Sequence, residues 1–382
     1  MYKTFEYRLF PNRTQHALLL SCLAESRLLY NEMLETLKAH YEQSGESLGR
    51  YDLTYRFKGR GGEHVPQSTV QALADRLDKA LNRFFRHREL GPKVGFPRFK
   101  GTNRWHSIWL RQYGPGRDVY LDPDTNRLRV PKKLGSRLKI KQHRPLEGTP
   151  KTVHLVHRAD GHWYALIACD LGEAPPKRDG AAVGLDVSLA HFVADSEDDV
   201  VENPCCFERG ARRLRRAQRK TARRKKGSNR RRKASKHTAK HHLKIARQRK
   251  DHAHKTARKC VDSYAFIAVE DLRVVNMLKN RHLARAISDA GWYVFVHILT
   301  LKAENAGARV VRVSPRFTSQ RCSECGDIVR KSLSVRTHVC GSCGYTADRD
   351  LNAAQNILRA GMRPSERNVG GCPERVPRSR LP

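Results

Sequence analysis

The sequence predicts a multidomain α+β protein, and three observations bear on this prediction and on the kind of partner the protein has. Lys and Arg total 75 against 38 Asp and Glu in 382 residues, which gives a formal net charge of +37. Two C-x-x-C-G units occur near the C-terminus. Short apolar strands alternate with helical segments, and two of these strands end in carboxylates. The length allows two or three domains and at least one sizeable core.

The net charge identifies the class of partner. Like charges at this density repel one another in the compact state, so a polyanion is expected to neutralise them. Nucleic acid is the leading candidate, and an acidic membrane surface is the alternative. No stretch of 18 apolar residues exists, and residues 1–30 alternate charged and aromatic residues instead of following a signal-peptide layout. We therefore expect a cytoplasmic protein with no membrane partner.

The N-terminal part is predicted to form one strand followed by two helices. Residues 2–10 are rich in aromatic residues and Thr, which favours a strand. Asn12 and Gln15 make a capping box for a helix that runs to about Leu37. A second helix is expected to begin at Ser68. The apolar stripes on both helices are typical of packing between them rather than of a ligand pocket.

From Gly91 to about Leu171 the pattern changes to short strands. Ser107–Arg111 alternates in polarity, and two apolar runs, 153–156 and 163–167, flank an Asp-Gly turn at Asp160. An all-β module of barrel type is expected, completed by the N-terminal strand. The stretch Glu173–Asp179, with two prolines, is interpreted as a linker.

After the linker, strands and helices alternate. The expected strands and helices are, in order, strand Ala182–Asp186, its returning partner His191–Asp195, strand Tyr264–Val269 ending at Glu270, helix Leu283–Asn305, strand Val310–Val313 and a helix from about Leu351 to Leu358. The tail after Gly361 has no periodicity and is predicted to be disordered.

A strongly basic segment interrupts this alternation. Residues 209–250 contain 21 Lys and Arg and no Asp or Glu, with a break at Gly227–Asn229. This pattern predicts two basic helices in a hairpin. A solvated charge run is the alternative, but basic side chains surround the helices with no acids to pair, so contacts with phosphates are expected. The candidate residues are Arg212, Arg213, Arg216, Arg223, Arg224 and Arg231.

The two C-x-x-C-G units predict a structural zinc site. Each turn directs two thiolates to one point, and together they make a closed tetrahedral set of four. A redox role is disfavoured because two such units occur and neither follows a thioredoxin-like strand. The other six cysteines are scattered, which indicates a reducing compartment rather than a disulfide framework. The predicted zinc ligands are Cys322, Cys325, Cys340 and Cys343.

Three carboxylates form the candidate catalytic site. Asp186 and Glu270 end apolar strands, and Asp350 lies at the start of a helix. Taken singly, each acid is explained as a turn or capping residue, and the helix dipole favours an acid at a helix start. Together, in a very basic protein, they predict phosphodiester hydrolysis by two Mg²⁺ ions held by hard oxygen ligands. No Ser-His-Asp arrangement or glycine-rich phosphate loop competes with this interpretation.

These segments also resemble a known family. The runs VGLDVSLAHFVADS, AVEDLRVVNMLKNRHLARAISDAGW, VSPRFTSQRCSECG and CGSCGYTADRDLNAAQNIL resemble successive motifs of the TnpB (OrfB) proteins of insertion sequences, relatives of type V CRISPR effector nucleases. The runs FEYRLFPNRTQ and GFPRFKG are similar to that family too. The resemblance covers most of the chain.

The resemblance implies an RNA-guided DNA endonuclease with a defined domain order. A β-barrel wedge domain would comprise residues 1–10 and 91–176, and a helical recognition unit residues 11–90. A split RuvC/RNase H-like nuclease domain would cover 180–360, with the basic hairpin at 208–259, the zinc ribbon at 318–346 and a tail at 361–382. No HNH-type insertion is present, so one nuclease centre would cut both strands in turn.

The resemblance also assigns roles and partners. Asp186, Glu270 and Asp350 match the magnesium ligands, with Asp348 as the alternative to Asp350, and Arg336 is a weaker candidate for phosphate stabilisation. The implied cofactors are two Mg²⁺ ions, one structural Zn²⁺ and a guide RNA. The implied assembly is a monomeric ribonucleoprotein that acts on double-stranded DNA in a bacterial or archaeal cytoplasm, in association with the nucleoid.

Some functional questions stay open at this stage. The start of the second helix, with Gln67, Ser68 and Gln71, is a candidate for reading a DNA motif next to the target, because Gln can bind base edges. Two alternative functions are a DNA transposase that acts without a guide RNA and a nuclease-inactive RNA-guided repressor. All three carboxylates are present, which disfavours the repressor.

Overall fold

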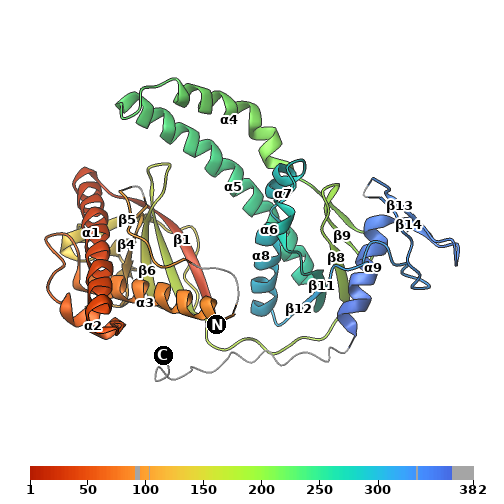
Figure 1. The fold of residues 1–382 in the computed structure, drawn as a ribbon, viewed down its shortest axis with the longest axis horizontal. Helices are drawn as coiled ribbons and strands as arrows, with labels where there is room; N and C mark the ends of the chain where they lie inside the picture. The colour runs from red at the N-terminus through yellow and green to blue at the C-terminus, as the bar shows by residue number, and fades with distance from the viewer. Residues whose placement is uncertain (91–94, 103, 333, 364–382) are drawn as a thin grey trace. The chain divides into compact units, whose positions relative to one another are not determined.

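In the computed structural model the chain divides into two units (Figure 1). The structure describes residues 1–90, 95–102, 104–332 and 334–363. The first unit comprises Met1–Glu173 and Thr221–Lys240, and the second comprises Ala174–Lys220 and His241–Pro382. Residues 364–382, most of the predicted tail, lie outside the described residues.

The first unit contains a seven-stranded sheet in which the N-terminal strand is central. Strand β1 (Tyr2–Phe10) pairs antiparallel with β7 on one side and β5 on the other. Its alternate residues Phe5, Tyr7 and Leu9 are buried, as the period of two in a strand requires. The sheet order is β2-β6-β7-β1-β5-β4-β3, with β2 Ser107–Leu110, β3 Tyr120–Asp122, β4 Arg127–Arg129, β5 Arg137–Lys141, β6 Thr149–His157 and β7 Trp163–Asp170.

The β6–β7 hairpin confirms the predicted pair of strands, and Gly161 in its turn has φ +82°. The segment 95–100 is not a strand, contrary to the expectation of strands from residue 91 onward. Its backbone is instead hydrogen-bonded to Asn31, which lies in the helix Arg13–Ser44. The Lys100 N–H donates to Asn31 Oδ1 at 2.7 Å, and Asn31 Nδ2 donates to the Lys100 carbonyl at 3.1 Å.

Three helices accompany this sheet: α1 (Arg13–Ser44), α2 (Arg50–Arg56) and α3 (Gln67–Leu90). The predicted capping box is confirmed, because the Gln15 N–H donates to Asn12 Oδ1 and the Asn12 N–H donates to Gln15 Oε1. Helix α2 was not predicted. Apolar residues of α1 and α3 belong to the same buried cluster as the sheet residues, so helices and sheet share one core. A short 3₁₀ turn, η1 (Lys132–Leu134), precedes β5.

The second unit contains a five-stranded sheet in the order β10-β9-β8-β11-β12. The strands are β8 (Ala182–Asp186), β9 (His191–Asp195), β10 (Val200–Glu202), β11 (Phe266–Glu270) and β12 (Arg309–Val313). Strand β11 pairs parallel with both β8 and β12, whereas β8 and β9 are antiparallel. The β8, β9, β11 and β12 strands were predicted from their apolar runs, and β10 was not.

Helix α9 (Arg349–Met362) lies directly against this sheet and contacts β8 and β11. Two glycines allow its close approach. A Cβ on Gly184 of β8 would lie 2.0 Å from the Ala354 carbonyl oxygen, and a Cβ on Gly361 would lie 2.7 Å from the Ala268 Cβ. Both distances are shorter than real Cβ contacts, so these positions exclude a side chain.

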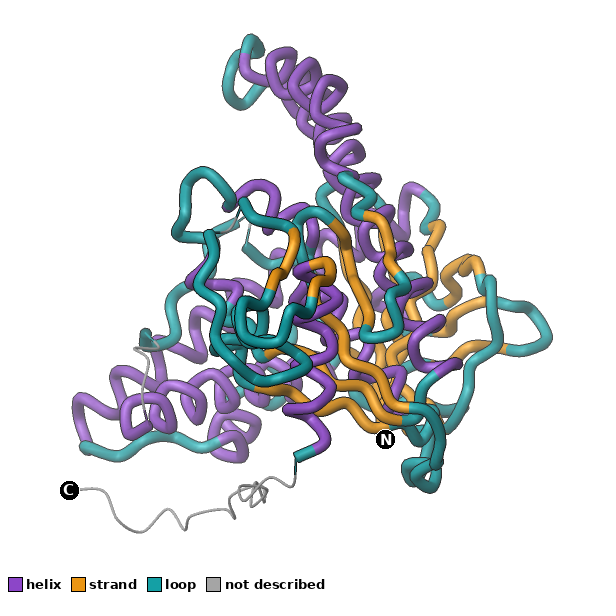
Figure 2. Tube along the Cα trace, turned by 90° about the vertical axis from the view of Figure 1, so that its right-hand side faces the viewer, coloured by secondary structure: helices purple, strands orange, loops and turns teal. Residues whose placement is uncertain are grey.

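The remaining helices of the chain are α4 (Cys206–Ala222), α5 (Asn229–Ser263), α6 (Val274–Met277), α7 (Ala284–Ala290) and α8 (Trp292–Asn305). Helices α4 and α5 run side by side as the predicted hairpin (Figure 2), with Leu214 of α4 and Ile245 of α5 in one buried cluster. The single helix predicted over 283–305 is wrong. Gly291, with φ +69°, ends α7 by donating to the Ile287 carbonyl and begins α8 in a new direction. Among the described helices, none has the length and apolarity needed to cross a membrane.

Candidate active site and metal centre

Two of the predicted carboxylates end neighbouring parallel strands. Asp186 is the last residue of β8 and Glu270 the last of β11, and these strands pair in register through Leu185 and Val269. The carboxyl ends of parallel neighbours lie at the same edge of a sheet, so the topology brings the two acids together. Asp350, in the first turn of α9, is buried at 3% exposure, and Asp186 is buried at 9%.

The charges of the other two acids act on Asp186. Burial, with the nearby charges of Glu270 and Asp350, raises the pKa of Asp186 well above its ordinary value, against the opposing effect of Arg349 and Arg336. Burial also raises the pKa of Glu270, which a hydrogen bond from Thr318 partly offsets. A set of buried carboxylates whose charges repel one another fits a hard divalent cation, which would compensate that repulsion.

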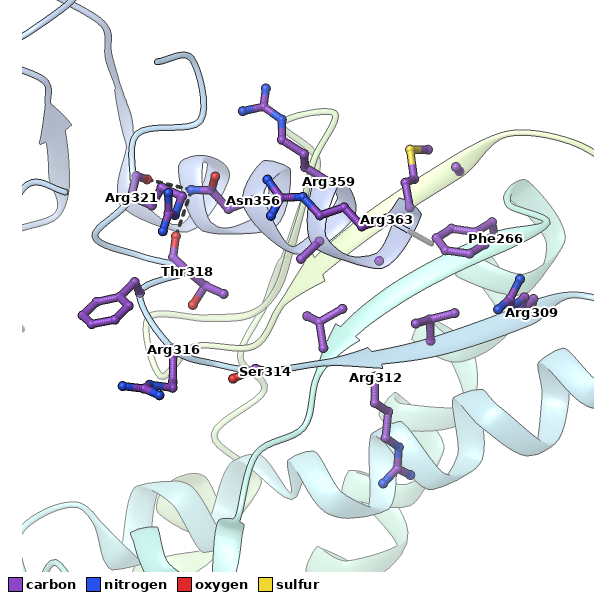
Figure 3. A pocket seen from close by; sticks show the side chains of 17 residues that line it. Phe266, Arg309, Arg312, Ser314, Arg316, Thr318, Arg321, Asn356, Arg359 and Arg363 are labelled. Carbon is purple, nitrogen blue, oxygen red and sulfur yellow. Dashed lines mark hydrogen bonds between the residues drawn. The ribbon is translucent and has the colours of Figure 1, made fainter. Parts of the chain in front are cut away.

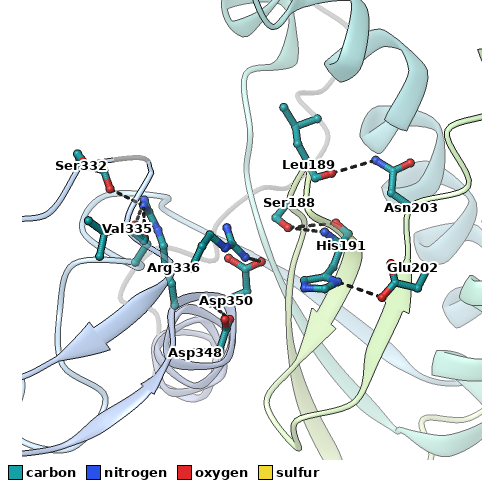
Figure 4. Close-up of polar contacts among 12 residues, drawn as sticks. Ser188, Leu189, His191, Glu202, Asn203, Ser332, Val335, Arg336, Asp348 and Asp350 are labelled. Atoms are coloured by element: carbon teal, nitrogen blue, oxygen red, sulfur yellow. Dashed lines mark hydrogen bonds and ion pairs between the residues drawn. The ribbon is translucent and has the colours of Figure 1, made fainter. Parts of the chain in front are cut away.

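Asp348 and Asp350 have different positions and partners. Asp348 is exposed and is the N-cap of α9, where its Oδ1 accepts the Asp350 N–H at 2.7 Å. Asp350 is the buried acid that interacts with Asp186. Its Oδ2 lies 2.5 Å from Arg336 Nη2, in an ion pair between an almost fully buried carboxylate and a half-exposed guanidinium (Figure 4).

The four cysteines form a compact cluster. Their sulfurs all lie within 4.8 Å of one another, with Cys322–Cys343 at 3.7 Å and Cys325–Cys340 at 3.5 Å. Four thiolates about 2.3 Å from a tetrahedral zinc would be separated by about 3.8 Å. Backbone N–H groups of Cys343 and Ser342 lower the pKa of Cys340 to about 6, whereas burial and the neighbouring thiols raise the pKa of Cys325 and Cys343. The cluster can therefore hold a zinc ion. The three carboxylates do not reach this spacing, since within the described ranges only the cysteines do.

Helix α9 is tied to the cysteine ribbon by two asparagines that sequence reasoning missed. Asn352 Oδ1 accepts the Ser323 N–H at 2.9 Å, between two of the cysteines, and its Nδ2 donates to the Arg321 carbonyl at 2.8 Å. Asn356 Nδ2 donates to the carbonyls of Arg321 and Thr318 at 2.7 and 3.0 Å. These asparagines are four residues apart and are fully or nearly buried. A pair of polar residues on the apolar face of the helix was the feature of the sequence that could have revealed this contact.

The start of α9 is tied to the ribbon in the same way. Arg349, buried, donates to the carbonyls of Ser332 and Val335 and to Ser319 Oγ. Its own N–H donates to the Arg336 carbonyl at 2.7 Å. The ribbon hairpin of β13 (Thr337–Val339) and β14 (Thr346–Asp348) leads directly into α9. The position of Asp350 therefore depends on hydrogen bonds between the first turn of α9 and the ribbon.

Thr318 is a further residue that the sequence did not indicate. It is buried at 8% exposure, and its Oγ1 donates to Glu270 Oε1 at 2.5 Å. The hydroxyl fixes one oxygen of this carboxylate and leaves the other available to a ligand. Its spacing from Cys322 carries no recognisable metal or catalytic pattern, which is why it was missed.

The predicted nucleic-acid contacts differ in exposure. Ser68 is buried at 9%, Gln67 is exposed and its Oε1 accepts the Gly59 N–H, and Gln71 is half-buried. On the basic hairpin, five of the six candidate arginines are exposed. The sixth, Arg231, is half-buried, and its Nη1 donates to the Thr221 and Arg224 carbonyls. It closes the turn of the hairpin by satisfying the end of α4.

Family models match three parts of the chain. A model described as "Probable transposase" (OrfB_IS605) matches residues 166–281, a "Cas12f1-like, TNB domain" model matches 292–357, and an OrfB_IS605 "Helix-turn-helix domain" model matches 1–46. In the structure the last segment is a strand followed by the single long helix α1.

The chain also matches whole relatives. It is 32% identical over 388 residues to a putative RNA-guided DNA endonuclease of Streptomyces pristinaespiralis, covering 98% of this chain and 92% of that protein. It is 33% identical over 312 residues to the putative RNA-guided DNA endonuclease InsQ of Escherichia coli K12, covering 77% of this chain and 74% of that protein. A solved Cas12f1–sgRNA–target DNA complex has the same fold, with a TM-score of 0.64 at 14% identity over 91% of this chain and 83% of the Cas12f1 chain.

Proposed function

The chain belongs to the OrfB (TnpB) family of transposon-encoded proteins, and from this membership we propose that it is an RNA-guided DNA endonuclease with a RuvC-like centre at Asp186, Glu270 and Asp350. The convergence of these acids at one edge of a parallel pair of strands is the observation that supports the assignment most directly. The five-stranded order, with antiparallel β8–β9 and parallel β8–β11–β12, is consistent with an RNase H-like arrangement.

The proposed chemistry is hydrolysis of a phosphodiester bond. Asp186, Glu270 and Asp350 would hold two Mg²⁺ ions, which when bound would supply Lewis-acid stabilisation of the attacking and leaving oxygens. Thr318 orients Glu270 through its hydroxyl. Arg336 holds Asp350 and carries a half-exposed guanidinium, which is placed to bind a phosphate oxygen when the ion pair opens. The cysteine cluster, as a closed zinc site, would stabilise the ribbon and take no part in the reaction.

In this proposal the first unit and the basic hairpin bind the nucleic acids. The seven-stranded sheet would serve as the wedge domain, and α1 to α3 as the recognition unit. The exposed arginines of α4 and α5 would contact the backbone of the guide RNA–DNA duplex, in which base pairing supplies the sequence specificity. Of the three residues proposed to read a flanking motif, the exposed Gln67 and half-buried Gln71 are placed better than the buried Ser68.

The test is a cleavage assay on protein purified with its own RNA. Small RNA that copurifies is sequenced, and the ribonucleoprotein is given Mg²⁺ and a library of matching duplexes with randomised flanks. We expect cleavage beside one short motif and a loss of at least about 10³-fold in Asp186→Ala, equivalent to about 4 kcal/mol of barrier. Cutting or joining of transposon ends without RNA would support a transposase instead. Guided binding without cleavage by the wild type would support a repressor.

A further inference from the structure

The second unit contains a cavity whose lining includes none of the three carboxylates. It has a volume of about 740 Å³ and lies between the edge strand β12, the segment that follows it and the C-terminal half of α9 (Figure 3). Its size is within the range of ligand sites. Strand β12, which forms one wall of the cavity, is the edge strand of the five-stranded sheet and pairs with β11.

The lining of this cavity is strongly basic. Six arginines and no Asp or Glu contribute to it: Arg309, Arg312, Arg316, Arg321, Arg359 and Arg363. Figure 3 shows Arg312 pointing away from α9, and its Nη1 lies 3.6 Å from Asp271 Oδ1. For the other five, the described part of the chain supplies no carboxylate within 4.0 Å. Unneutralised arginines gathered around one cavity are suited to a ligand with several negative charges, such as a run of phosphates.

Aromatic rings accompany these charges. Phe317 is 45% exposed and has φ +62°, a conformation that is strained for a bulky residue. The Arg316 guanidinium lies 5.7 Å from its ring centroid, and Arg309 lies 5.8 Å from the half-buried ring of Phe266. Arginines beside exposed aromatic rings are typical of sites for single-stranded nucleic acid, in which phosphates bind the cations and unpaired bases stack on the rings.

One lining residue of the cavity contacts a carboxylate of the candidate active site. Thr318 lines the cavity, and its hydroxyl donates to Glu270. Asn356 lines it as well and binds the Thr318 carbonyl. A strand in the cavity would therefore lie one side chain away from a proposed metal ligand, which favours the substrate strand over the guide as its occupant.

We propose that the arginine-lined cavity between β12 and α9 binds an unpaired strand of the DNA target, with its phosphates on the arginines and a base on Phe317. The proposal rests on the proposed nuclease function and adds a substrate contact to it. Only an unpaired strand can stack a base on Phe317, so the occupant is a displaced or melted strand rather than a duplex.

The direct test is site-specific crosslinking. The photoreactive residue p-benzoylphenylalanine replaces Phe317 in an Asp186→Ala ribonucleoprotein, and the control carries it at Tyr293 of α8, which is 69% exposed and outside the cavity. Both are irradiated with a duplex that matches the copurified RNA, with separate labels on the two DNA strands and the RNA. We expect a crosslink to one DNA strand from position 317 and none from position 293. A crosslink from position 317 to RNA alone, or none, would overturn the proposal.

A charge series provides an independent measure. Arg309→Gln, Arg316→Gln and Arg359→Gln are combined, and the matched control combines Arg273→Gln, Arg281→Gln and Arg285→Gln, which are also exposed in the same unit. Binding of a mixed-sequence single-stranded DNA oligonucleotide is measured against salt. The cavity variant should lose about 2 from the slope of log K against log[salt], at about 0.7 per phosphate contact. An equal or smaller loss than in the control would contradict the site.

The two experiments separate the site from the nuclease. A protein that crosslinks DNA at position 317 and never cleaves a guided target keeps the cavity proposal and refutes the nuclease. A ribonucleoprotein that cleaves in the wild-type form, but whose position-317 probe reacts with RNA alone or not at all, keeps the nuclease and refutes the cavity proposal.

Discussion

The cysteine cluster and the carboxylate centre lie in one unit but are assembled in opposite ways. The cysteines are close in sequence, and their sulfurs already have the spacing of a tetrahedral zinc site. The carboxylates come from two strands and a helix that are distant in sequence, and their charges repel one another. The cysteine site thus depends on two local turns, whereas the carboxylate site depends on the whole sheet. The hydrogen bonds from α9 to the ribbon make the second depend on the first.

The largest effect should come from breaking the cysteine site. Cys322→Ser should remove the zinc and release the ribbon from α9, because structural zinc contributes folding free energy. We expect zinc content to fall from about one ion to none, the melting temperature to fall by several degrees, and cleavage to fall at least about 100-fold. Metal analysis, calorimetry and the cleavage assay measure these outcomes.

Cys205→Ser is the matched control, since Cys205 is half-buried and outside the cluster. It should keep both zinc and activity. If Cys322→Ser instead retained full cleavage after losing its zinc, the dependence of the carboxylates on the ribbon would be refuted.

A smaller effect is expected from the hydroxyl that orients Glu270. Thr318→Val removes the hydrogen bond and keeps the shape of the side chain, so cleavage should fall about 10-fold and require more Mg²⁺ for half-maximal rate. Thr318→Ser, which keeps a hydroxyl, should restore most of the loss. A merely structural role for Thr318 would lower the melting temperature without shifting the Mg²⁺ dependence.

Neutralising one carboxylate should stabilise the metal-free protein. The pKa of Asp186 is raised in the folded state, so its ionisation opposes folding, and stability is lost as the pH rises from the unfolded value towards the folded one. Asp186→Asn removes this loss, and we expect a gain of about 1–2 kcal/mol in chelator at neutral pH. The gain should shrink in acid, where the wild-type carboxyl is protonated in both states.

Thermal unfolding with and without Mg²⁺ measures this prediction. Mg²⁺ should stabilise the wild type and have less effect on Asp186→Asn, because it binds the folded carboxylates. An Asp186→Asn protein that is less stable than the wild type in chelator at every pH would show that the carboxylate is held by favourable contacts instead.

The smallest effect should come from a single arginine of the basic hairpin. Arg216 is exposed on α4, and Arg216→Gln should lower the salt slope of duplex binding by about 0.9 with no change in stability. Arg231→Gln should show the reverse pattern, because its guanidinium holds the turn of the hairpin. Equal salt slopes in the wild type and Arg216→Gln would assign this residue to a solvated surface.

Patterns within short segments of the sequence predicted much of this fold and of its candidate sites. The spacing of the cysteines predicted their cluster, and the apolar runs before Asp186 and Glu270 predicted strands β8 and β11. The split of the helix at Gly291 was not predicted, because glycine is tolerated within a helical pattern and only its positive φ ends α7. Thr318 and the buried asparagines of α9 were also missed, since their partners are set by tertiary structure.

Helix α9 combines three tasks within fourteen residues, and this fixes its phase. Asp350 in its first turn faces the carboxylates, Asn352 and Asn356 bind the ribbon, and Arg359 reaches the cavity at its other end. One residue inserted between Asn352 and Asn356 would turn everything beyond it by about 100° and advance it by about 1.5 Å. It would also move Gly361 off Ala268, where no side chain fits. The length of this helix is therefore expected to tolerate no insertion or deletion.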